Sequence, residues 1–202
     1  MKLTPVIILA AAAGAFYYFN HLKTSKQDPT PEAQPWPALG EVVFIHKGVP
    51  IYSNGEDVYK SNGKHYAADG YYYGHKWQCV EFIKRYYHDA HQHNMPDVWG
   101  HAVSFFDPKI PHAHLNPARN MQQYYNAYSE PPKAEDLLVW GGRYGHVAII
   151  SEVHDDHVII VQQNIKYQPQ ARLPLIKKDK LYILQSDSGH RPPGWLRINP
   201  KS

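Results

Sequence analysis

The first hydrophobic pattern with a clear period lies between Cys79 and about His93. Apolar residues recur there every three or four positions, at Cys79, Phe82, Ile83, Tyr86 and Ala90. This spacing gathers them on one side of an α-helix. We therefore predict a helix with one buried face and with Cys79 in its first turn.

A second helix is predicted after Asn116. Asn116 and Pro117 have the residue types of an N-cap followed by the first helical position. The side chains that would line its buried side are Met121, Tyr124, Tyr125 and Tyr128. The pair Pro131 and Pro132 would end this helix.

The other hydrophobic runs have the length and residue types of strands. A turn at 46–48 separates the runs 42–45 and 49–53, which predicts a hairpin, and the polar stretch 54–70 predicts a surface loop. Later runs that predict strands are 137–140, 147–153, 157–161, 181–184 and 195–198. Helices followed by antiparallel strands predict an α+β domain, with the helices packed on one face of the sheet.

The beginning of the chain predicts export. Residues 1–23 combine a positively charged start with an uncharged apolar run from Val6 to Phe19, as in a signal peptide or an N-terminal membrane anchor formed by residues 5–20. The mature protein would then be periplasmic or held at the inner membrane. Residues 24–37 contain four prolines and predict a linker, which leaves 38–199 as the folded domain.

Composition narrows the classes of function. The 202 residues include 21 Lys and Arg against 18 Asp and Glu, a net charge of +3 without a basic cluster, so we expect no nucleic-acid partner. One cysteine excludes an internal disulfide and a cysteine-rich zinc site. Several of the 14 histidines are close in sequence, but acidic partners at ligand spacing are lacking, so we expect no metal. We expect a monomer.

Two residues have the chemistry of a nucleophile and its base. Cys79 starts a predicted helix, where backbone amides and the helix dipole favour a thiolate. His146 follows Gly145 at the start of a predicted strand, where an imidazole can face a thiol on a neighbouring helix. If the strands 147–153 and 157–161 form a hairpin, Gln162 or Asn164 lies opposite His146 and can orient its ring, while Gln163 points away.

Two segments give the chain a family resemblance. Gly74–Phe82 (GHKWQCVEF) and Gly145–Ile150 (GHVAII) resemble the cysteine, histidine-dependent amidohydrolases/peptidases known as the CHAP family, and within it the glutathionylspermidine amidase domains. The resemblance extends from about Gly40 to Trp195. It implies a papain-like α+β fold for 38–199 and an enzyme that cleaves a C–N amide bond without a cofactor.

The resemblance also implies roles for individual residues. Cys79 would be the nucleophile, which forms a thioester, and His146 the general base. Gln162 aligns with a glutamate of the related amidases, so it or Asn164 would orient the imidazole. The residues expected to contact substrate are Gln78, Trp77, Lys84 and Arg85, and Lys84 stands where the related amidases carry an arginine.

Three functions follow from these features. The first is hydrolysis of a polyamine amide or another small peptide amide, as the closest resemblance implies. The second is cleavage of cell-wall peptide by an exported peptidoglycan amidase or endopeptidase. The third is a catalytically weak binding or redox-sensing module, because a neutral glutamine replaces the acidic third residue and a single thiol can be oxidised.

Overall fold

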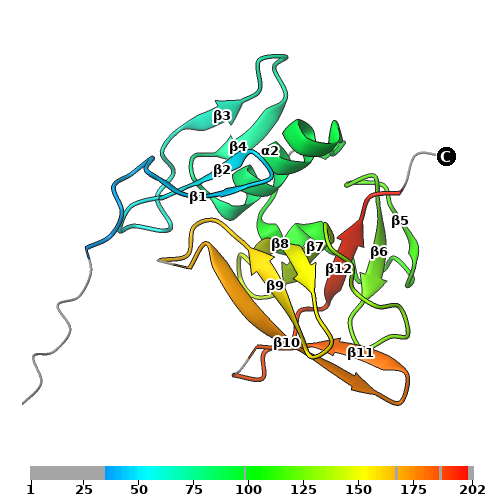
Figure 1. The fold of residues 1–202 in the computed structure, drawn as a ribbon. Helices are drawn as coiled ribbons and strands as arrows, with labels where there is room; N and C mark the ends of the chain where they lie inside the picture. Colours follow the sequence, from blue (N-terminus) through cyan, green and yellow to red (C-terminus); the bar gives the residue numbers. More distant parts are fainter. Residues whose placement is uncertain (1–34, 98, 167, 187, 200–202) are drawn as a thin grey trace, which may run out of the picture. The chain divides into compact units, whose positions relative to one another are not determined.

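The computed structural model describes residues 35–97, 99–166, 168–186 and 188–199 (Figure 1). The predicted export segment and most of the predicted linker lie outside the described residues. Trp36–Ser202 forms a compact unit. Within the described ranges, no helix has the length and hydropathy needed to span a membrane.

An antiparallel sheet of eight strands dominates this unit, in the order β11-β10-β9-β8-β7-β12-β6-β5. Its strands are β5 (His114–Asn116), β6 (Met121–Tyr125), β7 (Leu137–Trp140), β8 (His146–Val153), β9 (His157–Val161), β10 (Gln170–Lys178), β11 (Leu181–Leu184) and β12 (Gly194–Arg197). The last strand, β12, lies between β6 and β7 rather than at an edge.

Two small hairpins and one α-helix precede the sheet in the chain (Figure 1). The hairpins are β1 (Val42–His46) with β2 (Val49–Tyr52), and β3 (Lys64–Tyr66) with β4 (Tyr72–His75). The helix α2 (Cys79–His91) follows β4, and a 3-10 helix, η1 (Ala102–Phe105), precedes β5. The predicted first hairpin and the predicted helix at Cys79 are therefore confirmed.

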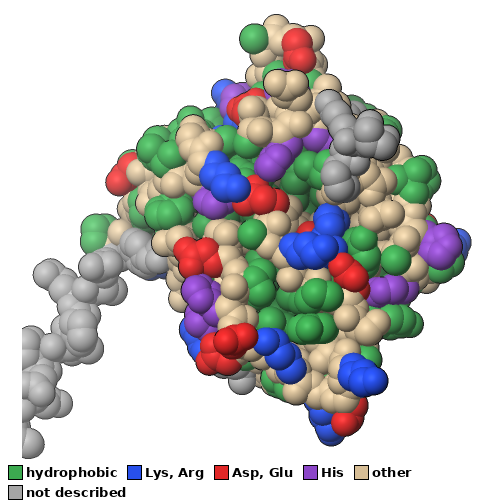
Figure 2. All heavy atoms as spheres, turned by 45° about the vertical axis from the view of Figure 1, so that its right-hand side comes forward, with side chains coloured by type: hydrophobic (Ala, Val, Ile, Leu, Met, Phe, Trp, Pro, Cys, Tyr) green, Lys and Arg blue, Asp and Glu red, His purple; other side chains and the backbone are tan. Residues whose placement is uncertain are grey.

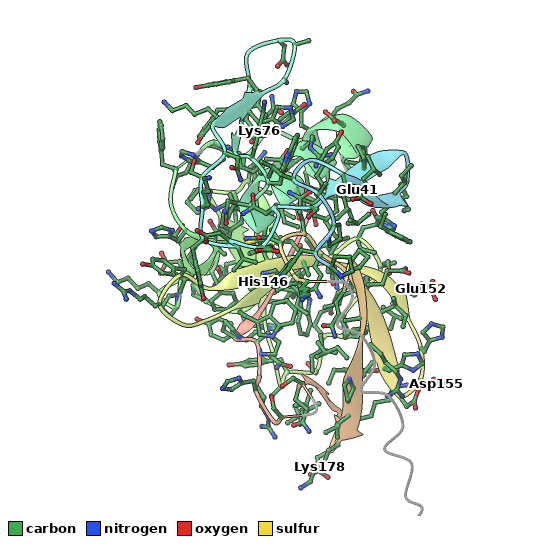
Figure 3. All side chains as sticks on the ribbon, turned by 90° about the vertical axis from the view of Figure 1, so that its left-hand side faces the viewer. Glu41, Lys76, His146, Glu152, Asp155 and Lys178 are labelled. Carbon is green, nitrogen blue, oxygen red and sulfur yellow. The ribbon has the colours of Figure 1, made fainter. Side chains whose placement is uncertain are left out.

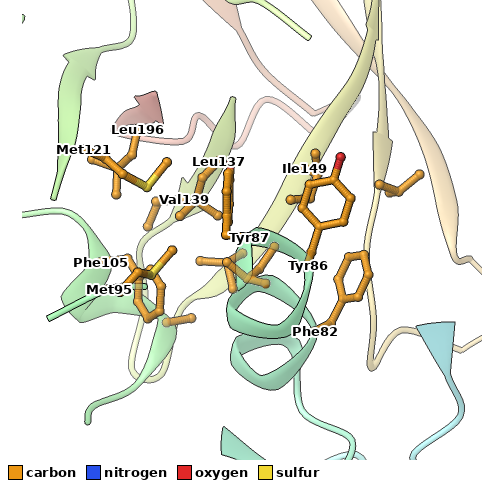
Figure 4. Packing of buried hydrophobic residues seen from close by; sticks show 14 of the residues in the cluster. Phe82, Tyr86, Tyr87, Met95, Phe105, Met121, Leu137, Val139, Ile149 and Leu196 are labelled. Carbon is orange, nitrogen blue, oxygen red and sulfur yellow. The ribbon is translucent and has the colours of Figure 1, made fainter. Parts of the chain in front are cut away.

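The core forms where α2 packs on the sheet (Figure 4). Phe82, Ile83, Tyr86 and Tyr87 of α2 are fully buried in one cluster with residues of β7 and β8. A second cluster, which includes Leu138, Ile150 and Trp195, covers the opposite face of the same strands. Because both faces of the central strands are buried, their sequences are continuous hydrophobic runs.

The predicted second helix is wrong, because residues 114–125 form β5 and β6. Met121 and Tyr124 are three residues apart, so they lie on opposite faces of a strand, and each face is covered by a different cluster. A strand buried on both sides thus has the three-residue spacing that also predicts a helix. Pro117 lies in the β5–β6 turn, where the Arg119 N–H donates to the Asn116 carbonyl at 3.2 Å.

The predicted α+β papain-like arrangement is also wrong. The structure is mostly β, with 36% strand and 10% helix, and α2 is the one α-helix among the described residues. Among the residues that the structure describes, no layer of several helices precedes the sheet in the chain. Part of the difference is β3, which occupies the predicted loop at 54–70.

Strand β10 also has no counterpart in the prediction. Pro174 interrupts its hydrophobic run, and Lys177 and Lys178 end it with charge. Strand β10 pairs with β9 and β11 through its backbone. At the surface, Arg172 contacts Asp156 at 2.9 Å and Lys177 contacts Asp155 at 3.1 Å, both in the turn before β9. Figure 2 shows positive and negative side chains interspersed over the face that it draws.

We expect the contact between β12 and β6 to be the least tolerant of added volume. A Cβ atom on Gly194 would lie 1.9 Å from the Tyr124 carbonyl oxygen, and a backbone atom cannot turn aside. Gly194→Ala should lower the free energy of unfolding by about 3 kcal/mol, measured by urea denaturation. Gly141→Ala is the control, because nothing lies within 4 Å of its added Cβ, and equal stability of the two variants would contradict the prediction.

Candidate active site

Cys79 is the first residue of α2, and the first turn of this helix packs against β4. The backbone of Gly74 in β4 has φ +144°, and a Cβ there would come within 3.1 Å of the Cα of Glu81. Glycine therefore lets β4 approach the first turn of the helix. Gln78 precedes the helix in an extended conformation, and its carbonyl accepts the Phe82 N–H at 3.3 Å.

Cys79 packs against β8 as well as against its own helix. It lies against the buried cluster that contains Val147. Burial raises the pKa of Cys79 to about 11, and the backbone N–H groups of Val147, Val80 and Cys79 act in the opposite direction. Val147 directly follows His146. The structure thus brings the two predicted catalytic residues, from α2 and from β8, to the same place.

His146 lies at the beginning of β8 (Figure 3), directly after Gly145. Gly145 has φ +70°, and a Cβ there would lie 2.5 Å from the Val103 nitrogen and 2.6 Å from the Trp140 carbonyl oxygen. Only glycine fits between η1 and the end of β7 in this conformation. The imidazole lies beside the Trp140 ring, with 5.6 Å between ring centroids.

Gln162 holds the imidazole of His146 by a hydrogen bond. The His146 Nε2 and the Gln162 Oε1 are 2.9 Å apart, and the Gln162 Nε2 donates to the Gln168 carbonyl at 2.9 Å. The second bond orients the amide with its oxygen toward the ring, so His146 donates from Nε2 and its Nδ1 carries no proton. Burial lowers the pKa of His146, while the bond to Gln162 partly offsets this.

Asn164, the other predicted partner of His146, lies elsewhere. Its Nδ2 donates at 2.8 Å both to the Gln78 Oε1 and to the Val58 carbonyl. The β8–β9 pairing contains a bulge between Ile150 and Glu152, and β9 ends at Val161. The regular alternation assumed for the hairpin therefore stops before Asn164.

Glu81 forms a buried polar network that the sequence analysis did not identify. Its carboxylate lies 2.8 Å from the His65 Nδ1, and it accepts the Arg85 Nε–H at 2.6 Å and the Gln163 Nε2–H at 2.7 Å. Burial alone would raise the pKa of Glu81, but these hydrogen bonds outweigh it and lower the pKa. The i, i+4 spacing of Glu81 and Arg85 was the available signal.

Lys84 and Arg85, which the sequence analysis expects to contact substrate, are buried in the interior. Lys84 donates to the Tyr72 carbonyl, and burial lowers the pKa of its amine to about 8. Arg85 donates to Glu81 and, at 2.8 Å, to the Pro50 carbonyl. Both side chains hold α2 against the hairpins in this structure.

Gln78 and Trp77 also make internal contacts. The Gln78 amide donates to the carbonyls of Val58 at 3.2 Å and Lys60 at 3.0 Å, so both of its N–H groups are used. The predicted contact between Gln78 and substrate stays a prediction. Trp77 is partly buried, and its ring lies 4.0 Å from that of Tyr52, between centroids.

Asn54 is a further residue that the sequence analysis missed. It is buried, and its Nδ2 lies within 3.3 Å of the carbonyls of Asp57, Val58 and Lys60. Its Oδ1 accepts the Trp77 N–H at 2.9 Å. Asn54 thus ties the loop 54–62 to the residues before Cys79. The Asn54-Gly55 dipeptide predicts a turn but not this anchoring role.

Metal binding has little support in the described part of the chain, where no group of three or more His, Cys, Asp or Glu side chains is arranged to hold an ion. The arrangement that remains is a partly buried thiol at the start of α2 and, at the start of β8, a partly buried imidazole that Gln162 orients. Such a pair can transfer a proton from sulfur to nitrogen while the sulfur attacks an electrophilic carbon.

Comparisons with known proteins agree with this chemistry. The CHAP domain model matches residues 70–164, a segment that contains Cys79, His146 and Gln162. The bifunctional glutathionylspermidine synthetase/amidase of Escherichia coli (strain K12) is 36% identical over 107 residues, which are 50% of this chain and 17% of that protein. The trypanothione synthetase of Crithidia fasciculata is 28% identical over 172 residues, 78% of this chain and 26% of that protein.

These comparisons confirm the predicted resemblance and support an amidase or peptidase function. They cover only part of the relatives, because the chain spans 17% of the length of the first and 26% of the second. What the whole relatives act on is therefore a proposal for this chain.

We predict that a carboxylate at position 162 raises the pKa of His146. Gln162→Glu would place a negative charge beside the imidazole, which favours its protonated form by about one pKa unit or more. NMR titration of the His146 ring measures this value. Gln92→Glu adds the same charge beyond the far end of α2 and should leave the titration unchanged. A His146 pKa that is equal or lower in Gln162→Glu than in the unchanged protein would contradict the prediction.

We also predict that the free protein holds Cys79 as a neutral thiol at pH 7. Because its pKa is raised to about 11, the rate of alkylation by iodoacetamide should climb about tenfold per pH unit between pH 7 and pH 9. Mass spectrometry of the single cysteine follows the reaction, with N-acetylcysteine as the reference thiol. A rate that is already constant below pH 7 would reveal a thiolate–imidazolium pair instead.

Proposed function

For a chain whose residues 70–164 match the CHAP domain, we propose hydrolysis of an amide bond with Cys79 as nucleophile and His146 as general base. The observation that carries the proposal is the meeting of α2 and β8: Cys79 packs against the buried cluster that contains Val147, the residue that follows His146. The 2.9 Å contact between His146 and Gln162 supports the role of Gln162 as the residue that orients the base.

The first half-reaction forms a thioester. The Nδ1 of His146 takes the thiol proton as the Cys79 sulfur attacks the carbonyl carbon, and the carbonyl electron pair moves to oxygen. The backbone N–H groups at the start of α2, with the helix dipole, favour this negative charge. His146 then donates its proton to the departing amine as the C–N bond breaks.

The second half-reaction returns the enzyme to its starting state. A water molecule attacks the thioester while His146 takes its proton, and the carboxylic acid leaves as the Cys79 sulfur regains a proton. Throughout the cycle, Gln162 keeps the ring in one orientation and tautomer. Its neutral amide gives the imidazolium no charge stabilisation, so we expect slower catalysis than with a carboxylate at this position.

The substrate proposed first is an amide between a glutathionyl carboxyl group and a polyamine. This rests on the similarity to the bifunctional glutathionylspermidine synthetase/amidase. The same thiol chemistry also cleaves peptides, and the export segment predicted within residues 1–23 favours a cell-wall peptide as the second candidate. The raised pKa of Cys79 counts against a redox-sensing module, because oxidation begins at the thiolate.

The proposal is tested by incubating the full-length protein with glutathionylspermidine and measuring free spermidine by mass spectrometry. We expect release by the unchanged protein and loss of release in Cys79→Ala, because the nucleophile is gone. Gly141→Ala is the matched control, since position 141 lies in open space, and it should release spermidine at the rate of the unchanged protein.

A purified cell-wall peptide is the second arm of the same experiment. Release of spermidine without peptide cleavage supports the first substrate, and peptide cleavage alone replaces it with the second. If neither amide is cleaved by folded protein whose thiol reacts with iodoacetamide, the proposed hydrolysis is wrong for these substrates.

A further inference from the structure

His88 of α2 contacts a carboxylate with each of its two ring nitrogens. Its Nδ1 lies 2.8 Å from the Asp89 Oδ1, and its Nε2 lies 3.1 Å from the Asp69 Oδ2. A neutral imidazole has one N–H group and can donate to only one of these oxygens, whereas an imidazolium donates from both nitrogens. The hydrogen bonds around His88 are therefore complete only when the ring is protonated.

The two carboxylates belong to different elements of the fold. Asp89 follows His88 in α2, whereas Asp69 lies in the turn 67–71 that joins β3 to β4. The other oxygen of Asp69, Oδ1, accepts the Tyr71 N–H at 2.9 Å, and the Ala67 N–H donates to the Tyr71 carbonyl at 2.9 Å. The contact between His88 and Asp69 thus fastens the tip of the β3–β4 hairpin to the second half of α2.

Two tyrosines complete the surroundings of the imidazole. The Tyr71 ring is stacked on that of His88, with 5.2 Å between centroids and 8° between the planes. Tyr73 of β4 donates its hydroxyl to the Asp89 Oδ1 at 2.6 Å, and the same hydroxyl oxygen lies 3.2 Å from the His88 Nδ1. Because an aromatic face at this distance attracts a cation, Tyr71 also favours the protonated ring.

Positive charge is present near the same group. The Lys84 Nζ lies 4.9 Å from the centre of the Tyr71 ring, and the charge of Arg119 acts on the Tyr71 hydroxyl. Desolvation lowers the pKa of His88, but the hydrogen bonds and charges of its two aspartate partners outweigh this effect and raise the pKa. The two carboxylates therefore decide the protonation of the ring.

We propose that His88 is a pH-sensitive latch, which holds the β3–β4 hairpin on α2 when its ring is protonated and loosens the tip of the hairpin when the ring is neutral. Because folding raises the pKa of His88, the latch stabilises the protein fully below about pH 6.5 and loses this effect as the pH rises through the folded-state pKa. Strand β3 also carries His65, whose ring contacts Glu81 in the first turn of α2. The latch therefore holds one wall of the candidate active site, and it depends on no assumption about the reaction.

NMR titration of the full-length protein measures the protonation of His88, whose signal is identified by its absence from His88→Gln. We expect a pKa above 6.5. Asp69→Asn should lower it by about half a unit, a roughly threefold shift in the protonation equilibrium, because one exposed partner charge is gone. Asp155→Asn is the matched control, since Asp155 is fully exposed and contacts Lys177 instead, and it should leave the His88 titration unchanged. A pKa at or below 6.5, or no fall in Asp69→Asn, overturns the latch.

Hydrogen exchange then tests whether the hairpin responds. The Ala67 N–H reports on the tip, and the Ile150 N–H, which donates to the Asp136 carbonyl at 2.9 Å, reports on the large sheet. After correction for the intrinsic exchange rate, the protection of Ala67 should fall about threefold from pH 6 to pH 8, and that of Ile150 should fall less. In His88→Gln, which keeps an N–H donor without a charge, Ala67 should be equally protected at both pH values. The same pH dependence in His88→Gln, or an equal fall at Ile150, overturns the latch.

Discussion

The buried carboxylate of Glu81 is the interaction on which the arrangement of the site depends. It joins His65 of β3, Arg85 one turn further along α2, and Gln163 after β9. A buried charge is stable only when its hydrogen bonds are satisfied, so these elements are held together or the network fails as a whole. This one group fixes the helix start that carries Cys79 to two other parts of the chain, β3 and the segment after β9.

The position of Gln163 also explains how its two neighbours reach different partners. Gln163 points inward, where it donates to Glu81 and accepts the Tyr52 N–H at 2.9 Å. Gln162 then points to His146, and Asn164 points to Gln78. One anchored residue in the middle therefore sets the orientation of both the base and the residue before the thiol.

The sequence predicts correctly those elements in which the spacing of hydrophobic residues matches the face that is buried. The period of α2, the runs of β7 to β9 and the direction of Gln162 follow from alternation and spacing. The β5–β6 region was misread because burial on both faces of β6 gives strand residues a helical period. The interior roles of Lys84 and Arg85 depend on which elements pack over them, and a single sequence does not contain that information.

The carbonyl of Val58 lies within hydrogen-bonding distance of three amide side chains, those of Asn54, Gln78 and Asn164. A loop held at so many points has already lost its conformational freedom when the protein folds. Association with a ligand then carries no further entropic cost for ordering this segment, and more of the contact energy appears as affinity. The same rigidity limits the range of ligand shapes to which the loop can adapt.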